Sequence, residues 1–295
     1  MKDLRIGIIG GSGLEAKLFD DLAVSDVEHV ACDTPFGRPS GTIVTGVHAG
    51  VPIALLSRHG DGHLLNPAAV PYRANVFALK TLGCTHIVAF GATGSLREEI
   101  ALGDLVICDQ LIDRTDGRPR TFYEGAAVHV EFAEPFCPVL RRWLHEAATG
   151  LDGVGVHGTG CYVCMQGPAF STRAESHMHR LLGADVVGMT VQPEARLARE
   201  AEIAYAMVAL PTDYDCWRPR PPGDEDSVLA EILGNLDRAT DASIRLLAAA
   251  LGDVTMLHGT PSPAHDALAR SIWSDKSAID ARLVEKLRPL WGRYF

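Results

Sequence analysis

The sequence lacks long apolar runs and any excess of basic residues. No stretch approaches the roughly 20 apolar residues that a membrane-spanning helix requires, and the formal net charge is -10 over 295 residues. Because a surface that binds nucleic acid or an anionic membrane must be basic, we expect neither as a partner. The apolar run at 4–9 is also too short for a secretory signal. These absences predict a cytoplasmic protein.

The sequence also lacks a set of paired cysteines. Its seven cysteines are an odd number, scattered along the chain without the density of a small disulfide scaffold. Cys161 and Cys164 form a single CxxC with no second pair. Because the segment is predicted as a strand, residues three apart point to opposite faces and cannot share one ion. We therefore expect reduced structural cysteines and neither a redox pair nor a zinc site.

Short β-branched runs alternate with segments of helical periodicity along most of the chain. Expected strands cover 4–9, 42–47, 51–56, 86–90, 105–112, 159–165, 185–189 and 205–210. Expected helices cover 70–82, 172–182, 194–201 and 277–287, with others after Pro138 and from Val228. This alternation predicts an α/β fold, a mainly parallel sheet covered by helices on both faces.

The chain is expected to form one domain over 1–295, because its length can bury one large core. The segment RPRPPGDED at 218–226 is rich in proline and charge and predicts a flexible linker. Residues 227–295 after it are predicted to be mainly helical.

Polar and small residues follow several expected strands where each one ends. In parallel sheets ligands bind outside the carboxyl ends of the strands. The segments at these ends are Gly10-Gly11-Ser12, Arg58-His59-Gly60, Gly91-Ala92-Thr93, Met189-Thr190 and Asp213-Tyr214-Asp215. We expect a ligand site there.

The glycine loop after the first strand allows two interpretations. Gly11–Ala16 matches the G-x-G-x-x-A dinucleotide fingerprint, with Asp33 about 20 residues further on. However, Glu15 would place a carboxylate near a pyrophosphate, and the strand before Asp33 is poorly formed. The favoured interpretation is a loop that offers backbone N–H groups and the Ser12 hydroxyl to a single phosphate. A nicotinamide cofactor site is the alternative.

The second candidate anion site is the segment from Arg58 to His63. The planar guanidinium of Arg58 suits bidentate contact with phosphate, and His59 could serve as a second donor. A metal site through His59 and His63 is disfavoured, because the glycines between them oppose a helix and no third ligand is near. A structural role is the remaining alternative. No metal is expected.

Asp213 and Asp215 stand at the end of a buried strand. If the segment stays extended, both carboxylates lie on one side. A helix cap or a surface turn is the alternative, but the flanking Tyr214, Cys216 and Trp217 are poor surface residues.

Taken together, these motifs resemble the 5'-methylthioadenosine phosphorylase branch of the trimeric purine nucleoside phosphorylase family. The resemblance rests on segments between residues 6 and 217, including IGIIGGSGL, DTPFG, RHG, GSLREEI, AEPFCP, RAES, GADVVGMT and TDYDCW. It implies a single-domain phosphorylase-type fold and a pentosyltransferase activity. Inorganic phosphate would be a co-substrate, with no metal or organic cofactor. It also implies a homotrimer whose sites lie at subunit interfaces.

The same resemblance implies roles for individual residues. The phosphate-binding set is Ser12, Arg58, His59, Gly91, Ala92 and Thr190; the nucleoside-binding set is Phe170, Ser171, Met189, Asp213 and Asp215. Phe170 would stack on the purine and Met189 would pack beneath the ribose. His129 would reach the 5' pocket of a neighbouring subunit.

Two positions depart from the family pattern, and the 5' pocket has two interpretations. Gly91 stands where threonine is common, which removes one hydroxyl from the phosphate site, and Ala169 stands where arginine is frequent. The 5' pocket is expected to be apolar, drawn from Val228, Ile232 and the aromatic C-terminal residues. The same apolar stripe could equally belong to the core.

The chemistry that these residues predict is phosphorolysis of an adenine nucleoside with inversion at C1'. Burial and the neighbouring Asp215 are expected to keep Asp213 protonated, so that it donates to purine N7. Carboxylate acceptors would favour the amino group of adenine over a 6-oxo group. Alternatives are a 6-oxopurine or methylthioinosine phosphorylase, a phosphorylase for another 5'-substituted adenosine, and a non-catalytic nucleoside-binding protein.

Overall fold

The computed structural model describes residues 4–11, 17–18, 21–219 and 225–295, with the backbone alone for 225–229. Ser12 and most of the glycine loop therefore lie outside the described residues, as do 220–224 of the predicted linker. Residues 225 and 226 of that linker already belong to a helix.

A single mixed sheet of eleven strands forms the centre of the described molecule. One path through it runs β2-β3-β4-β1-β5-β10-β9-β7. Off this path, β11 pairs with β5 and β6, and β8 pairs with β6. The strands are β1 (Ile6–Gly10), β2 (Ser25–Val30), β3 (Ile43–His48), β4 (Val51–Ser57), β5 (His86–Ser95), β6 (Leu105–Ile107), β7 (Gln110–Arg114), β8 (Val156–His157), β9 (Cys161–Met165), β10 (Val186–Gly188) and β11 (Ala204–Asp213). Pairings β1–β4, β1–β5, β5–β11, β6–β8, β7–β9 and β9–β10 are parallel.

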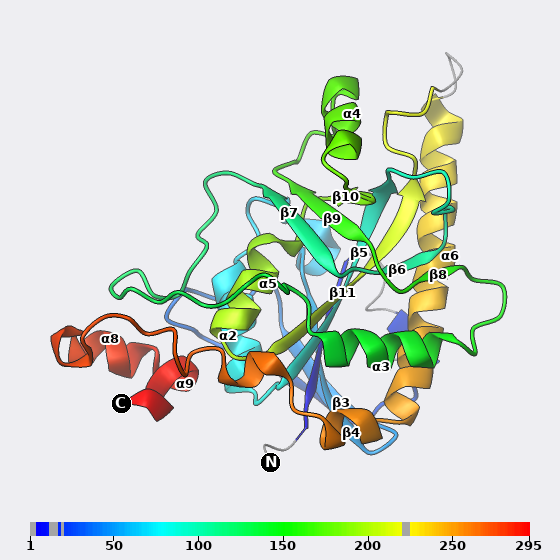
Figure 1. Ribbon diagram of the computed structural model, residues 1–295. Coiled ribbons are helices and arrows are strands. Elements are labelled where there is room, and N and C mark those ends of the chain that lie inside the picture. The colour runs from blue at the N-terminus through cyan, green and yellow to red at the C-terminus, as the bar shows by residue number, and fades with distance from the viewer. Residues whose placement is uncertain (1–3, 12–16, 19–20, 220–224) are drawn as a thin grey trace.

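Helices cover both faces of this sheet, as predicted (Figure 1). One face carries α2 (Tyr72–Thr81), α5 (Val191–Glu200) and α9 (Arg288–Trp291), and the other carries α3 (Pro138–Ala148), α6 (Glu225–Gly252) and α7 (Thr255–Gly259). Other helices with bounds in the described residues are α4 (Arg173–Leu181), α8 (Ala281–Lys286) and the short 3-10 turns η1 (Asp61–His63), η2 (Pro263–Asp266), η3 (Lys276–Ala278) and η4 (Gly292–Tyr294). The predicted α/β class with a mainly parallel mixed sheet is confirmed.

Two apolar cores result from the two-residue period of the central strands. Ile8 and Val88 point into the core beneath α3 and α6, whereas Ile9 and Ala89 point into the core beneath α2 and α5. All four side chains are buried. Because the strands are apolar on both faces, they form the buried centre of the sheet.

Several predicted boundaries were wrong for reasons that the pairings explain. The strand expected to end at Phe90 continues to Ser95, because β11 pairs with Gly91–Gly94 and β10 pairs with Gly94 and Ser95. The strand expected over 105–112 is two strands, since β6 pairs with β11 and β8 whereas β7 pairs with β9. β2 and β8 were not predicted.

The helix expected over 277–287 is also interrupted. The Asp275 carboxylate accepts a hydrogen bond from Ser277 N, and the Asp280 carboxylate accepts one from Arg282 N. Each aspartate is therefore the N-cap of a new short helix.

Candidate active site

A cavity of about 290 Å³ opens at the carboxyl ends of the central strands. It collects residues from segments far apart in the sequence. Strands and strand ends contribute Gly11 after β1, Arg58 and His59 after β4, Phe90–Gly94 of β5, Met165 of β9, Val187–Thr190 around β10, and Leu210, Thr212–Asp213 and Asp215 of β11 and its end. Loops and the turn η1 contribute His63, Pro67, Phe170 and Ser171, and α6 contributes Ile232, Leu236 and Thr240. All the strand-end segments singled out in the sequence thus contribute to one cavity, within the described residues.

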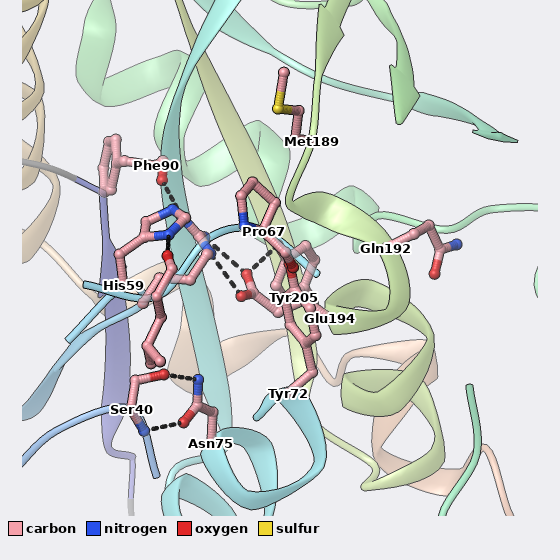
Figure 2. A network of polar contacts seen from close by, with 12 residues as sticks. Ser40, His59, Pro67, Tyr72, Asn75, Phe90, Met189, Gln192, Glu194 and Tyr205 are labelled. Carbon is pink, nitrogen blue, oxygen red and sulfur yellow. Dashed lines mark hydrogen bonds and ion pairs between the residues drawn. The ribbon is translucent and has the colours of Figure 1, made fainter. Parts of the chain in front are cut away.

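A buried ion pair forms one end of the cavity. Arg58 Nε donates to Glu194 Oε2 at 2.8 Å, Nη2 donates to Glu194 Oε1 at 2.9 Å, and Nη1 donates to the Phe90 carbonyl at 2.8 Å. Tyr205 OH donates to the same Glu194 carboxylate at 2.7 Å. Figure 2 shows Glu194, Tyr205 and the Phe90 carbonyl converging on this point.

This pairing keeps the Arg58 guanidinium charged and fixed in position. Arg58 is 1% exposed and Glu194 0%. Burial alone would lower the pKa of Arg58, but the charge and hydrogen bonds of Glu194 raise it above its ordinary value. A guanidinium has five N–H groups, so N–H groups on Nη1 and Nη2 are left for an anion in the cavity.

His59 lies beside this pair with one ring nitrogen committed. Nδ1 is 2.7 Å from the Leu65 carbonyl, and because a carbonyl only accepts, Nδ1 carries the hydrogen (Figure 2). Burial lowers the pKa of His59 to about 4, and the charge of Arg58 contributes to the shift. The ring is therefore neutral near pH 7 and its Nε2 is an acceptor. An acceptor at Nε2 suits the hydroxyl of hydrogen phosphate. This acceptor role differs from the donor role that the sequence predicted for His59.

Gly91 forms the floor of the cavity between Arg58 and Thr190. A Cβ built on Gly91 would lie 3.5 Å from Thr190 Oγ1 and 3.8 Å from Arg58 Nη1. It would also lie 3.1 Å from Met207 Cε, a flexible side-chain end. A side chain here would therefore enter the space between the cationic group and the Thr190 hydroxyl, which the glycine leaves open.

Asp213 and Asp215 both line the opposite end of the cavity, but not in extended backbone as expected. β11 ends at Asp213, and Asp215 has a left-handed φ of 47°. The turn lets Asp215 N donate to Asp213 Oδ1 at 2.7 Å, and Thr212 Oγ1 donates to Asp213 Oδ2 at 3.0 Å. Asp215 Oδ2 is buried without a hydrogen-bond partner in the described structure.

Gly94 makes this arrangement of the two aspartates possible. A Cβ built on Gly94 would lie 3.1 Å from Asp215 Cβ and 3.3 Å from Asp213 Oδ1. Any larger residue would displace the carboxylates, so the glycine is required by close approach.

Apolar side chains form the wall near the two aspartates. Met165, Met189 and Phe170 line it, and Phe170 is 82% exposed. Ile232, Leu236 and Thr240 line it from α6 at intervals of four residues, so they share one helix face. Thr240 was missed, although the same spacing continued from Ile232 would have found it. The Val228 side chain lies outside the described residues.

His129 and the aromatic C-terminal residues do not line this cavity. The His129 ring packs on Trp273 with centroids 4.6 Å apart, and Trp273 is 71% exposed. Trp291 is fully buried against Tyr123. Within this single chain, the tryptophan of the aromatic C-terminus therefore belongs to the core and does not line the cavity.

Glu194, which fixes Arg58, was also not predicted from the sequence. It is 136 positions from Arg58 in the chain, so no local spacing links the two. The only available signal was an acidic residue among the apolar positions of the helix that follows Thr190.

The described residues bear on three further expectations. No group of three or more His, Cys, Asp or Glu among them could hold a metal ion. All seven cysteines are free thiols, Cys164 buried and Cys161 partly exposed. In this part of the chain, no helix has the length and apolarity to cross a membrane.

The chain is similar to proteins of a known superfamily. Residues 5–252 match the model of the phosphorylase superfamily. The chain belongs to this superfamily. A protein of Chloroflexus aurantiacus named S-methyl-5'-thioadenosine phosphorylase is 46% identical, with 100% of each chain covered. One of the same name from Synechocystis is 45% identical, covering 100% of this chain and 89% of its own.

Solved structures of proteins with related names are also similar to this chain. A methylthioadenosine phosphorylase from an Antarctic soil metagenome has a TM-score of 0.87 and 42% identity, covering 98% of this chain and 99% of that chain. An S12T mutant of adenosine/methylthioadenosine phosphorylase from Schistosoma mansoni, in complex with methylthioadenosine, has a TM-score of 0.76 and 38% identity, covering 88% and 93%. The predicted family, phosphorylase-type fold and pentosyltransferase class are confirmed.

Proposed function

We propose that this chain converts 5'-methylthioadenosine and phosphate into adenine and 5-methylthioribose 1-phosphate. The observation that carries the proposal is one cavity with a fixed cationic group, Arg58, at one end and two carboxylates, Asp213 and Asp215, at the other. Such a cavity matches a reaction that joins an anion to a sugar while a purine leaves. Relatives of 45 to 46% identity, matched over 89 to 100% of their own length, carry the name of this activity.

At the phosphate end, Arg58 supplies the positive charge and the Thr190 hydroxyl and the backbone of Gly91 and Ala92 supply further contacts. His59 Nε2 accepts from the phosphate hydroxyl. We include Ser12 in this set on the sequence resemblance alone. Because Glu194 already fixes the guanidinium, little reorganisation is needed when the anion binds.

In the bond-changing step, a phosphate oxygen forms a bond to C1' on the face opposite the purine. The C1'–N9 bond breaks and its electron pair passes to the purine, so the configuration at C1' inverts. Asp213 in its protonated form donates to N7 as negative charge develops on the base. Positioning of the phosphate beneath C1' makes the attack effectively intramolecular.

Recognition of the base is assigned to the two carboxylates. The Asp215 carboxylate presents an oxygen without a protein partner among the described residues, which the adenine amino group could satisfy. A 6-oxo group would instead face this acceptor with a second acceptor, at a cost of about 1 to 3 kcal/mol. Phe170 stacks on the purine, Ser171 contributes a polar contact and Met189 packs beneath the ribose.

The 5' group is assigned to the apolar wall on α6, from Ile232 and its helix face. We further propose a homotrimer in which His129 reaches the 5' pocket of a neighbouring subunit. The exposure of Phe170 at the cavity mouth and of Trp273 beside His129 supports surfaces that a second copy would cover. The free cysteines fit the cytoplasmic location that we also propose.

The test is an assay of purified protein with 5'-methylthioadenosine, adenosine, 5'-deoxyadenosine and methylthioinosine, with and without phosphate. We expect phosphate-dependent release of free base, fastest from methylthioadenosine. A preference for methylthioinosine would overturn the base assignment. Nucleoside binding without release of base would indicate a non-catalytic binding protein. Light scattering of the same sample tests the trimer.

A further inference from the structure

A second buried arginine lies behind the cavity, between two segments that line it. Arg118 follows β7, is 6% exposed and is not a lining residue. Its Nη2 donates to the Gln166 carbonyl at 2.7 Å and its Nε to Gln166 Oε1 at 3.1 Å. Its Nη1 donates to the carbonyls of Met189 at 2.8 Å and Gln192 at 2.6 Å. One planar group thus connects the backbone of two separate segments.

Both segments carry residues of the nucleoside end of the cavity. Gln166 begins the stretch that leads from Met165 to Phe170 and Ser171, all three of which line the cavity. Met189 lies on the second segment and lines the cavity itself. β9 and β10 pair as far as Cys164 and Gly188. Beyond that pairing, the Arg118 guanidinium bridges the two segments.

The partners of Arg118 distinguish it from Arg58. In the described structure its hydrogen-bond acceptors are neutral: three backbone carbonyls, the Gln166 amide and the Tyr72 hydroxyl at 3.3 Å. An arginine that served only to balance a buried carboxylate would have such a carboxylate beside it. The arrangement uses the planar shape of the guanidinium and its several N–H groups, which a lysine ammonium does not reproduce.

We infer that Arg118 is a positioning residue of the nucleoside site, which holds the 166–171 segment at a fixed separation from Met189 without contacting the substrate. This inference rests on the proposed function for the identity of the nucleoside. Loss of the guanidinium frees the two segments to move apart, and the nucleoside loses its fit between Phe170 and Met189. The phosphate end keeps the separate Arg58–Glu194 pair.

The experiment compares Arg118→Lys and Arg118→Gln with the wild-type chain. KM and kcat are measured for methylthioadenosine at saturating phosphate, and KM for phosphate at saturating nucleoside. We expect kcat/KM for the nucleoside to fall about 10²-fold in both variants, because a displacement of about 1 Å can have that effect. The KM for phosphate should change much less. Lysine should not restore kcat/KM for the nucleoside, because it retains the positive charge but not the planar guanidinium with its several N–H groups.

Arg293→Lys is the matched control, because Arg293 also donates to several oxygens, including Glu202 Oε1 and the His265 carbonyl, but lies away from the cavity. It should lower the melting temperature and leave both KM values unchanged. If Arg118→Lys also lowers only the melting temperature, the positioning role is wrong. Full nucleoside affinity in Arg118→Lys would likewise overturn it.

Two additions keep the result decisive. If the Arg118 variants do not fold, Gln166→Leu is used, because it removes the side-chain oxygen to which Arg118 Nε donates. This variant should raise the nucleoside KM by a smaller factor. An unchanged KM would contradict the inference. Calorimetric binding of methylthioadenosine is measured in every variant. A wild-type chain that binds the nucleoside without turnover would refute the proposed reaction, while weaker binding in Arg118→Lys would still support the positioning role.

Discussion

The two ends of the cavity are built differently. At the phosphate end, the charged group follows β4, is fully buried and is held by Glu194 from α5. At the nucleoside end, Phe170 is 82% exposed and the aspartates stand in a turn just past the end of β11. Among the described residues, the first end is therefore a buried and ion-paired group, whereas the second exposes an apolar side chain.

This difference matches what each end has to recognise. Phosphate does not vary in size or shape, so a rigid, ion-paired group suits its recognition. Nucleosides differ in base and 5' group, and these are met by side chains on loops and on the face of α6. Substitutions at the phosphate end should therefore change binding of the anion and stability, and those at the nucleoside end should change selectivity and rate.

The largest expected effect is on the rate at the nucleoside end. Asp213→Asn should lower kcat for methylthioadenosine by about 10² to 10⁴, because the amide cannot act as a general acid. The KM for phosphate should stay near the wild-type value. Steady-state assays measure both, with Asp241→Asn, an exposed residue of α6, as the control. Near-normal turnover by Asp213→Asn would remove it from the catalytic role.

Breaking the ion pair should mainly destabilise the protein. Glu194→Ala leaves the buried Arg58 charge without its partner and should cost about 3 to 5 kcal/mol of unfolding free energy. Glu124→Ala, which breaks an exposed pair with Arg73, should cost about 1 kcal/mol or less. Denaturant unfolding compares the two. An equal loss of unfolding free energy in both variants would contradict the prediction, because the buried pair would then stabilise the protein no more than the exposed one.

A smaller change is expected from restoring a hydroxyl at the phosphate end. Gly91→Thr places Oγ1 near Thr190 and Arg58, and one added hydrogen bond of about 0.5 to 1.5 kcal/mol should lower the KM for phosphate about two- to tenfold. Met207 must shift by a few tenths of an ångström to admit the Cβ, which lies 3.1 Å from its Cε. Gly91→Ala brings the Cβ without the hydroxyl. The two variants should therefore differ; identical KM values would contradict the prediction.

The last expected effect is on the pH dependence of stability. The pKa of His59 is lowered by burial from 6.5 to about 4, so between these values the unfolded chain binds a proton that the folded chain does not. The contribution of His59 is therefore present above pH 6.5 and is lost as the pH falls toward 4. In His59→Asn the unfolding free energy should decline less over this window than in the wild type. Parallel curves would show that His59 is not buried in its neutral form.

Part of this site could be predicted from the sequence because its residues stand at strand ends. The Arg58-His59 and Asp213-Asp215 segments follow buried apolar strands, and such ends meet at one edge of a parallel sheet. The Arg58–Glu194 pair could not be predicted, because its partners are joined only by the tertiary fold. The extension of β5 to Ser95 was equally hidden: small residues there suggested a loop, but pairing with β10 and β11 makes them strand.

Conformation at the nucleoside end was predicted less well than position. An alternation of two carboxylates suggested extended backbone, yet the φ of 47° at Asp215 places the pair in a turn. Single-sequence patterns do not reveal such a turn, because the Gly94 that makes room for it lies on another strand. The core position of Trp291 was hidden for a related reason, since an apolar residue in a sequence does not show whether it lines a cavity or fills a core.

The unbroken course of β5 along the cavity floor has a consequence for the size of the substrate. Gly91 lies beside Arg58 and Gly94 lies beneath the two aspartates. Three residues of strand advance about 10 Å at roughly 3.3 Å each, which is the spacing along β5 between the arginine that would hold the anion and the aspartates that would hold the base. The backbone repeat therefore sets how long the substrate can be. A one-residue deletion within β5 would shorten that length and turn the following side chains to the other face, whereas point substitutions change only which base or 5' group fits.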